Sequence, residues 1–143
     1  MFYDRLTRRL HVEIGEEEYL LAFTLGGLQE LESRAGKPII DIASSGTVPP
    51  LSIMVDGFWI ALRDGGNDKR YTRNEGEKLA SRYIEESEDG VVSLGNLFFL
   101  LIGVSGLMGA KFRHQMLEQA GLEDKDASAS VAETPKKPKA RAK

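Results

Sequence analysis

The chain has 143 residues, of which 41% are hydrophobic and 29% charged, so its length and composition favour one globular core over two domains. It contains no cysteine, which excludes a disulfide framework and a thiolate metal site. The formal net charge is −3, but residues 135–143 hold five basic residues and no acid, so residues 1–134 carry 14 basic against 22 acidic groups and would repel a phosphate backbone.

Residues 9–24 predict a β-hairpin. Leu10, Val12 and Ile14 alternate with polar residues, as in a half-buried strand, and a Gly-Glu-Glu turn leads into a second alternating run. A hairpin alone is marginal in water, so we expect it to pack against helices. The first ten residues carry four charges and no apolar run, which predicts no signal peptide and favours a cytoplasmic location.

Two amphipathic helices are predicted after the hairpin. The first has Thr24 as its N-cap and ends at Gly36. Its apolar residues, at helical spacing, are Leu25, Leu28, Leu31 and Ala35. Residues 39–43 predict one or two further helical turns. Two prolines at 49 and 50 then start the second helix, whose apolar stripe consists of Leu51, Met54, Val55, Phe58 and Leu62.

Two more helices are predicted in the second half of the chain. Residues 64–68 have the composition of a loop, and Thr72 with Glu75 forms a capping box that starts the third helix. Residues 91–119 predict one long helix, the most apolar segment of the chain. Its principal buried positions are Leu94, Leu97, Phe98, Leu101, Ile102 and Met108.

These elements predict an α+β fold that is mostly α-helical, with an N-terminal β-hairpin packed on about four helices. One folded domain is expected over residues 1–120. From residue 121 the composition changes to Ala, Ser, Glu, Pro and Lys, which cannot bury enough apolar surface to offset its ordering entropy. We therefore predict that residues 121–143 form a disordered tail with a basic end.

No residue pattern indicates catalysis or metal binding. His11 and His114 are the only histidines, and neither has a partner at metal-ligand or triad spacing. The carboxylates cluster in turns or on polar helix faces, where solvated charge is the expected state. We therefore expect no enzyme activity, no metal and no cofactor.

The apolar stretch at residues 91–110 has two interpretations. Twenty residues without a formal charge are long enough to cross a bilayer, which would make the chain a single-span membrane protein of the holin type. Three polar residues, Ser93, Asn96 and Ser105, and four glycines lower the hydropathy of the stretch, so we prefer a buried or partner-binding helix and expect no membrane. A small intracellular adaptor that binds through its basic tail is a further alternative.

The segment from the hairpin into the first helix resembles the opening of tail assembly chaperones from long-tailed phages and gene transfer agents. Those proteins typically begin with a strand pair and a Thr-Leu-Gly-x-Leu-x-x-Leu-Glu type helix. The order of the later helices is also similar, so the resemblance covers roughly residues 9–120 in layout. The residues of this chain that match the family motif are Thr24, Leu25, Gly26, Leu28, Leu31 and Glu32.

The resemblance implies a late viral protein of the host cytoplasm that is absent from the mature virion. Such a chaperone binds the tape measure protein and keeps it soluble until tail tube protein polymerises around it. In many members a programmed ribosomal frameshift adds a domain that recruits tail tube protein, and this chain would be the unextended form. Several copies along an elongated client, and hence self-association, are also expected from the resemblance.

A holding role predicts exposed apolar helix faces that accept a client helix. The same side chains have a second interpretation, in which they fill the core. The loop at residues 64–71 and the basic tail match no family motif and receive no role. The side chains assigned to partner binding are Phe58, Trp59, Phe98, Phe99 and Leu101.

Overall fold

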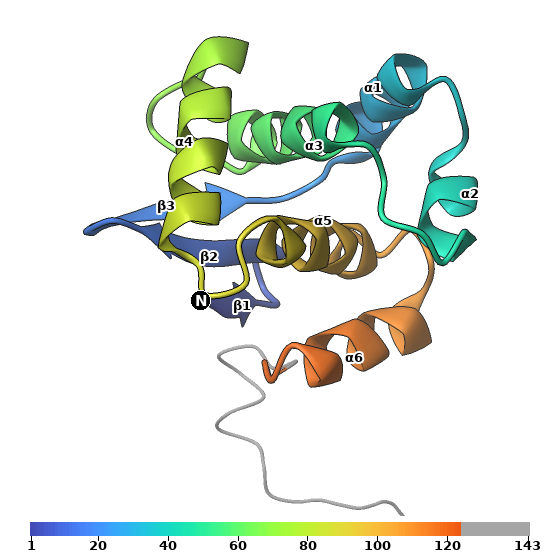
Figure 1. Cartoon of the computed structure of the whole chain (residues 1–143). Helices are drawn as coiled ribbons and strands as arrows, with labels where there is room; N and C mark the ends of the chain where they lie inside the picture. Colours follow the sequence, from blue (N-terminus) through green and yellow to red (C-terminus); the bar gives the residue numbers. More distant parts are fainter. Residues whose placement is uncertain (124–143) are drawn as a thin grey trace, which may run out of the picture.

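The computed structural model describes residues 1–123, which form a three-stranded antiparallel sheet followed by six helices (Figure 1). The predicted α+β, mostly helical fold class is confirmed. Of the predicted disordered tail, residues 124–143 lie outside the described residues, whereas Leu122 is partly buried against the core, so the predicted start of the tail at residue 121 is wrong. The elements are β1 (Phe2–Asp4), β2 (Arg9–Ile14), β3 (Glu17–Leu21), α1 (Leu25–Ala35), α2 (Ile39–Ser44), α3 (Leu51–Asp64), α4 (Arg73–Glu86), α5 (Val91–Val104) and α6 (Ala110–Gln119).

The sheet buries one face. The predicted hairpin is confirmed as β2 and β3, in which Leu10 pairs with Leu21 and Val12 with Tyr19, and all four side chains are buried. The sequence analysis missed β1, which adds a third strand and places the buried Tyr3 opposite Leu10. Three residues are too few to show a period of two, so this strand carries no signal of its own.

Local capping signals predict the helix boundaries well. The N–H of Gly27 donates to Thr24 Oγ1 over 3.0 Å at the start of α1, and Gly36 ends that helix in the left-handed conformation with φ of 73°. The capping box that joins Thr72 and Glu75 at the start of α4 is also present. These residues form hydrogen bonds with backbone groups that a helix leaves unpaired at its ends. Because each cap involves residues only a few positions apart, it can be recognised in the sequence.

The residues of the family motif lie in α1 and at its N-cap, and they have different structural roles. Leu28 and Leu31 are buried, but Leu25 is 65% exposed, so its expected place on the buried stripe is wrong. α3 packs against α1, and Leu28 is buried, whereas Leu25, the first residue of the helix, stays exposed. Glu32 accepts a hydrogen bond from the N–H of Ile39 over 2.8 Å and so caps α2, whose own N-cap, Pro38, makes no side-chain cap.

The central helix of the fold is α3, which contacts α1, α4, α5 and β3. It packs tightly on α5, where a Cβ added at Gly57 would lie 2.5 Å from Cε1 of Phe98. Phe98 is 1% exposed and meets Phe23 edge to face, with ring centroids 6.4 Å apart. The absence of a side chain at residue 57 therefore lets the two helices share one tightly packed core.

The prediction of one helix over residues 91–119 is wrong, because α5 ends at Val104 and α6 begins at Ala110. Gly106 and Gly109 adopt φ values of 86° and 92°, which break the helical path, and Ser105 donates its hydroxyl to the carbonyl of Ile102. The chain then folds back so that α6 packs on α5. Met108, an expected core position, lies in this break and is only partly buried.

The loop between α3 and α4, to which the sequence analysis gave no role, closes the outer edge of β3. Asn67 Oδ1 accepts from the N–H of Leu20 over 2.9 Å, and Asn67 Nδ2 donates to the carbonyls of Leu20 and Leu62 over 2.8 and 2.9 Å. Ala22 N–H adds a bond to the carbonyl of Ala61 over 3.1 Å. One amide therefore ties the sheet edge to the end of α3.

Changing Asn67 to Asp tests this tie. The carboxylate keeps the shape of the amide but has no N–H groups, so two carbonyls lose their donor and face a negative charge. We expect the free energy of unfolding to fall by about 2 kcal/mol or more, measured by urea denaturation. Asn74→Asp, at an exposed position in the first turn of α4, is the matched control and should leave stability unchanged or slightly raised. Equal stability of the two variants would contradict the role of Asn67.

The capping box predicts a pH dependence. Hydrogen bonds from Lys69 and from the N–H of Thr72 lower the pKa of Glu75 from 4.5 to about 2. Because the pKa is lower in the folded state, the stabilisation is complete above about pH 4.5 and disappears as the pH falls toward 2. Glu75→Gln keeps a capping side chain but has no charge to lose, so wild type should lose melting temperature faster than this variant over that range. Parallel curves would exclude this contribution of Glu75.

Candidate functional site

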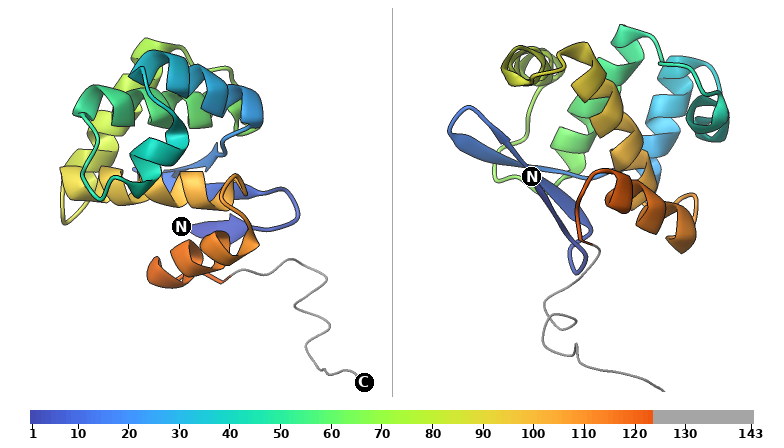
Figure 2. Two further views of the ribbon diagram at one scale, coloured as in Figure 1. Left: turned by 90° about the vertical axis from the view of Figure 1, so that its right-hand side faces the viewer. Right: turned by 60° about the horizontal axis from the view of Figure 1, so that its bottom comes forward.

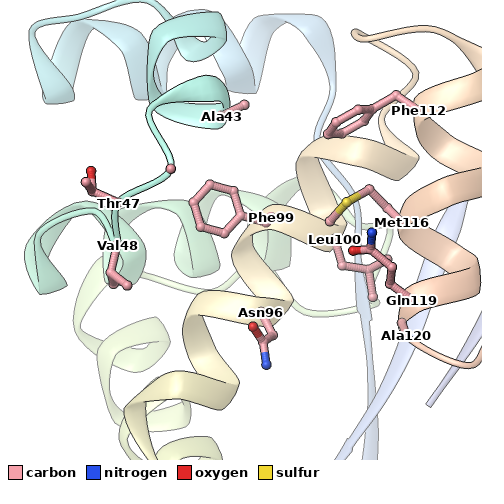
Figure 3. A pocket seen from close by; sticks show the side chains of 11 residues that line it. Ala43, Thr47, Val48, Asn96, Phe99, Leu100, Phe112, Met116, Gln119 and Ala120 are labelled. Atoms are coloured by element: carbon pink, nitrogen blue, oxygen red, sulfur yellow. The ribbon is translucent and has the colours of Figure 1, made fainter.

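An open apolar groove of about 560 Å³ lies on the surface of the molecule (Figure 3). Three segments form it: the end of α2 with the following loop, the outer face of α5, and one face of α6. Phe99 projects from α5 into the middle of the groove, facing the α2–α3 loop. The lining residues are Ala43, Gly46, Thr47, Val48, Asn96, Phe99, Leu100, Phe112, Met116, Gln119 and Ala120.

The position of Phe99 follows from the packing of its neighbour. Phe98 points into the core against Gly57, and the next residue on a helix points about 100° away from it. Phe99 is therefore only partly buried, and its ring stands edge to face on that of Phe98 with centroids 5.6 Å apart. The groove has a rigid aromatic floor that is supported directly by the core.

The α6 wall depends on a second close approach of two helices. A Cβ added at Gly103 would lie 2.7 Å from Cγ of Met116 and 3.4 Å from Cε2 of Phe112. The missing side chain at Gly103 lets these two residues rest on α5. Both of them also line the groove, so one pair of side chains holds α6 in place and forms the binding surface.

None of the residues that line the groove is charged, in a chain whose charged fraction is 29%. Its polar groups are the neutral side chains of Thr47, Asn96 and Gln119. Val48, on the opposite rim from α6, is 71% exposed. A surface of this kind favours an apolar ligand with few charges, because a charge brought into it would lose water and find no ionic partner.

The structure separates the five residues that the sequence analysis assigned to partner binding. Phe58, Phe98 and Leu101 are each 1% exposed and fill the core, so that assignment is corrected for these three. Only Phe99 lines the groove. The apolar stripe of α5 is real, but α3 and α4 pack against this helix and bury most of it, which a helical period alone does not reveal.

Trp59 lies elsewhere, between α1 and α4. The guanidinium groups of Arg34 and Arg63 lie over its ring at 5.1 and 5.0 Å from the centroid, and its Nε1 donates to the carbonyl of Tyr71 over 3.0 Å. Hydrogen bonds from Arg63 to Asp64 and Glu30 raise the pKa of that guanidinium above its usual value. This cluster holds helices together, and Trp59 is not part of the groove.

Several groove residues were missed by sequence reasoning. Phe112 and Met116 are four residues apart, a spacing that indicates one helix face, but they were read as the end of a single long helix. Val48 lies in a loop, where no periodicity applies. The groove exists only because residues 105–109 turn the chain back, and that turn is marked in the sequence by Gly106 and Gly109.

Within residues 1–123, no group of three or more His, Asp or Glu side chains is placed to hold a metal ion. In the same part of the chain, no single helix has the length and apolar character to cross a membrane. The pair α4 and α5 would pass that test together by length and composition, although the two helices are bent by 119°.

The two adjacent phenylalanines provide a test of this site. Phe98→Ala removes a core ring and should lower the free energy of unfolding by about 3–5 kcal/mol. Phe99→Ala opens space that water can enter and should lower it by about 1 kcal/mol. Urea denaturation of both variants measures the difference. Equal losses would mean that Phe99 belongs to the core and that the groove has no separate aromatic floor.

Comparisons with family models, with curated proteins and with solved structures found no match to this chain. The resemblance to tail assembly chaperones therefore rests on the motif in α1 and on the layout of the elements. Four of the motif residues, Thr24, Leu28, Leu31 and Glu32, cap helices or fill the core, so the motif describes a scaffold. The function has to be argued from the groove.

Proposed function

We propose that this protein is a tail assembly chaperone that holds the tape measure protein of a long-tailed phage or gene transfer agent by an apolar helix. The single observation that carries the proposal is the open groove, which has aromatic and aliphatic walls and no charged lining residue. The proposal includes a host cytoplasmic location, absence from the mature virion, and help in recruiting tail tube subunits.

The shape of the groove favours a helical ligand. An amphipathic helix places apolar side chains at i, i+3, i+4 and i+7 along one stripe, which suits a cleft walled by helices. Further exposed apolar side chains extend the surface: Leu51 follows Val48 at the start of α3, and Val92 precedes Asn96 by one turn on α5. Leu51 is 53% and Val92 58% exposed, so the surface offered to a client is longer than the hollow itself.

The charge of the chain suits a holding role. A tape measure protein has long apolar helical stripes, and its solubility depends on covering them. The 14 basic and 22 acidic groups of residues 1–134 give the chaperone a net negative charge, which opposes association of loaded complexes with one another. The groove shields the apolar stripe while the charged surface keeps the complex in solution.

Co-expression with the tape measure protein encoded nearby tests the proposal. Wild-type chain should move that protein from the insoluble to the soluble fraction. Phe99→Glu places a charge on the apolar floor of the groove and should abolish this effect while leaving the chaperone folded by circular dichroism.

Leu6→Glu is the matched control, because Leu6 is an exposed apolar residue, 63% exposed, that lies between β1 and β2 and does not line the groove. It should solubilise the client as well as wild type. No solubilisation by wild type, or equal activity of Phe99→Glu and Leu6→Glu, would overturn the proposal.

A further inference from the structure

Helix α6 forms one wall of the groove. Among the described helices it has the smallest share of buried residues. Only Leu117 of its ten residues is buried, whereas nine of the fourteen residues of α5 are buried. In Figures 1 and 2, α6 lies at the periphery, away from α1, α3 and α4. Its packing is mainly on α5. A helix with so little buried surface is stabilised mostly by the neighbour it rests on.

The connection between α5 and α6 has the features of a hinge. Gly106 and Gly109 both have positive φ values, and glycine can adopt a wider range of backbone conformations than other residues, so two permissive positions lie within a stretch of five. The N–H groups of residues 105, 106, 107 and 109 all donate to acceptors within four residues: the carbonyls of Leu101, Gly103 and Gly106 and the hydroxyl of Ser105. The N-cap of α6, Gly109, makes no side-chain cap. Rotation about this stretch would lift Leu117 and Met116 of α6 away from the core, while the pairing of the sheet strands stays intact.

We propose that α6 is a movable wall, which swings away from α5 about residues 105–109 to admit a client helix and closes on it afterwards. This regulation of the groove rests on the proposed function. Phe112 and Met116 provide the coupling, because they rest on Gly103 and also line the groove. A ligand that enters the groove therefore competes for the same side chains that hold α6 in place.

Hydrogen exchange of the full free chain tests the hinge without any ligand. We expect the backbone amides of α6 to exchange at least about tenfold faster than those of α5, because α6 opens while the core stays closed. Solubilised client should slow exchange in α6 more than in α4, which does not line the groove. Exchange in α6 that is as slow as in α5 would overturn the hinge, whether or not the client binds.

An engineered disulfide tests the coupling, and the chain suits this test because it has no cysteine of its own. A Cβ at residue 103 would lie 2.9 Å from the Cβ of Met116, whereas disulfide-bonded Cβ atoms are typically about 3.8 Å apart. A small outward shift of α6 thus allows the double variant Gly103→Cys, Met116→Cys to form the bond. Oxidation pins α6 to α5, and reduction frees it in the same molecule.

The uncharged dye Nile red is the probe of the groove, and the tape measure protein is the probe of function. The oxidised double variant should bind each at least about tenfold more weakly than the reduced form, and reductant should restore binding. The single variants Gly103→Cys and Met116→Cys control for the changed side chains and should not respond to reductant. Equal binding of the dye in both redox states would overturn the movable wall. Dye binding that depends on redox state, with no client binding in either state, would uphold the wall and reject the chaperone.

Discussion

The contact of Phe98 with the bare backbone at Gly57 is the constraint on which the rest of the molecule depends. It brings α5 against α3 at a distance that no larger residue would permit, since an added Cβ would lie 2.5 Å from the ring. It also sets the rotation of α5 about its axis. With Phe98 turned inward, Phe99 must face outward, so the packing of the core determines where the floor of the groove lies.

The helices and strands that the sequence predicts correctly are those whose sequence signals lie within a few neighbouring residues. The β2–β3 hairpin follows from the alternation around Val12, and α1 and α4 follow from Thr24 and from the capping box at Thr72. The break between α5 and α6 escaped prediction because the apolar character on either side continues through it. Gly106 and Gly109 turn the chain back, and the space beside Gly103 receives Met116, but an isolated glycine in an apolar run does not by itself show that a helix ends there.

The sequence predicts that the protein has an apolar surface for a client, but it does not predict which residues form that surface. Apolar helical surface for a client was expected, but Phe58, Phe98 and Leu101 are the same type of residue as Phe99, and only tertiary packing separates core from surface. The motif that carries the resemblance to tail assembly chaperones serves the scaffold, as the cap that Glu32 places on α2 illustrates. That cap helps to position the following loop, which carries Val48 to the rim. The motif and the groove are therefore linked through the fold.

The tie made by Asn67 has a consequence for self-recognition between copies of the chain. An uncovered strand edge is a template on which a second molecule can add a strand, and repeated addition leads to aggregates. On β3 the outward N–H and carbonyl of Leu20 are already occupied by the Asn67 amide, so a new strand would first have to displace it. The opposite edge is β1, only three residues long, which offers too short a ladder to seed growth. A chain with so much apolar surface is in this way kept from joining its neighbours through their sheets.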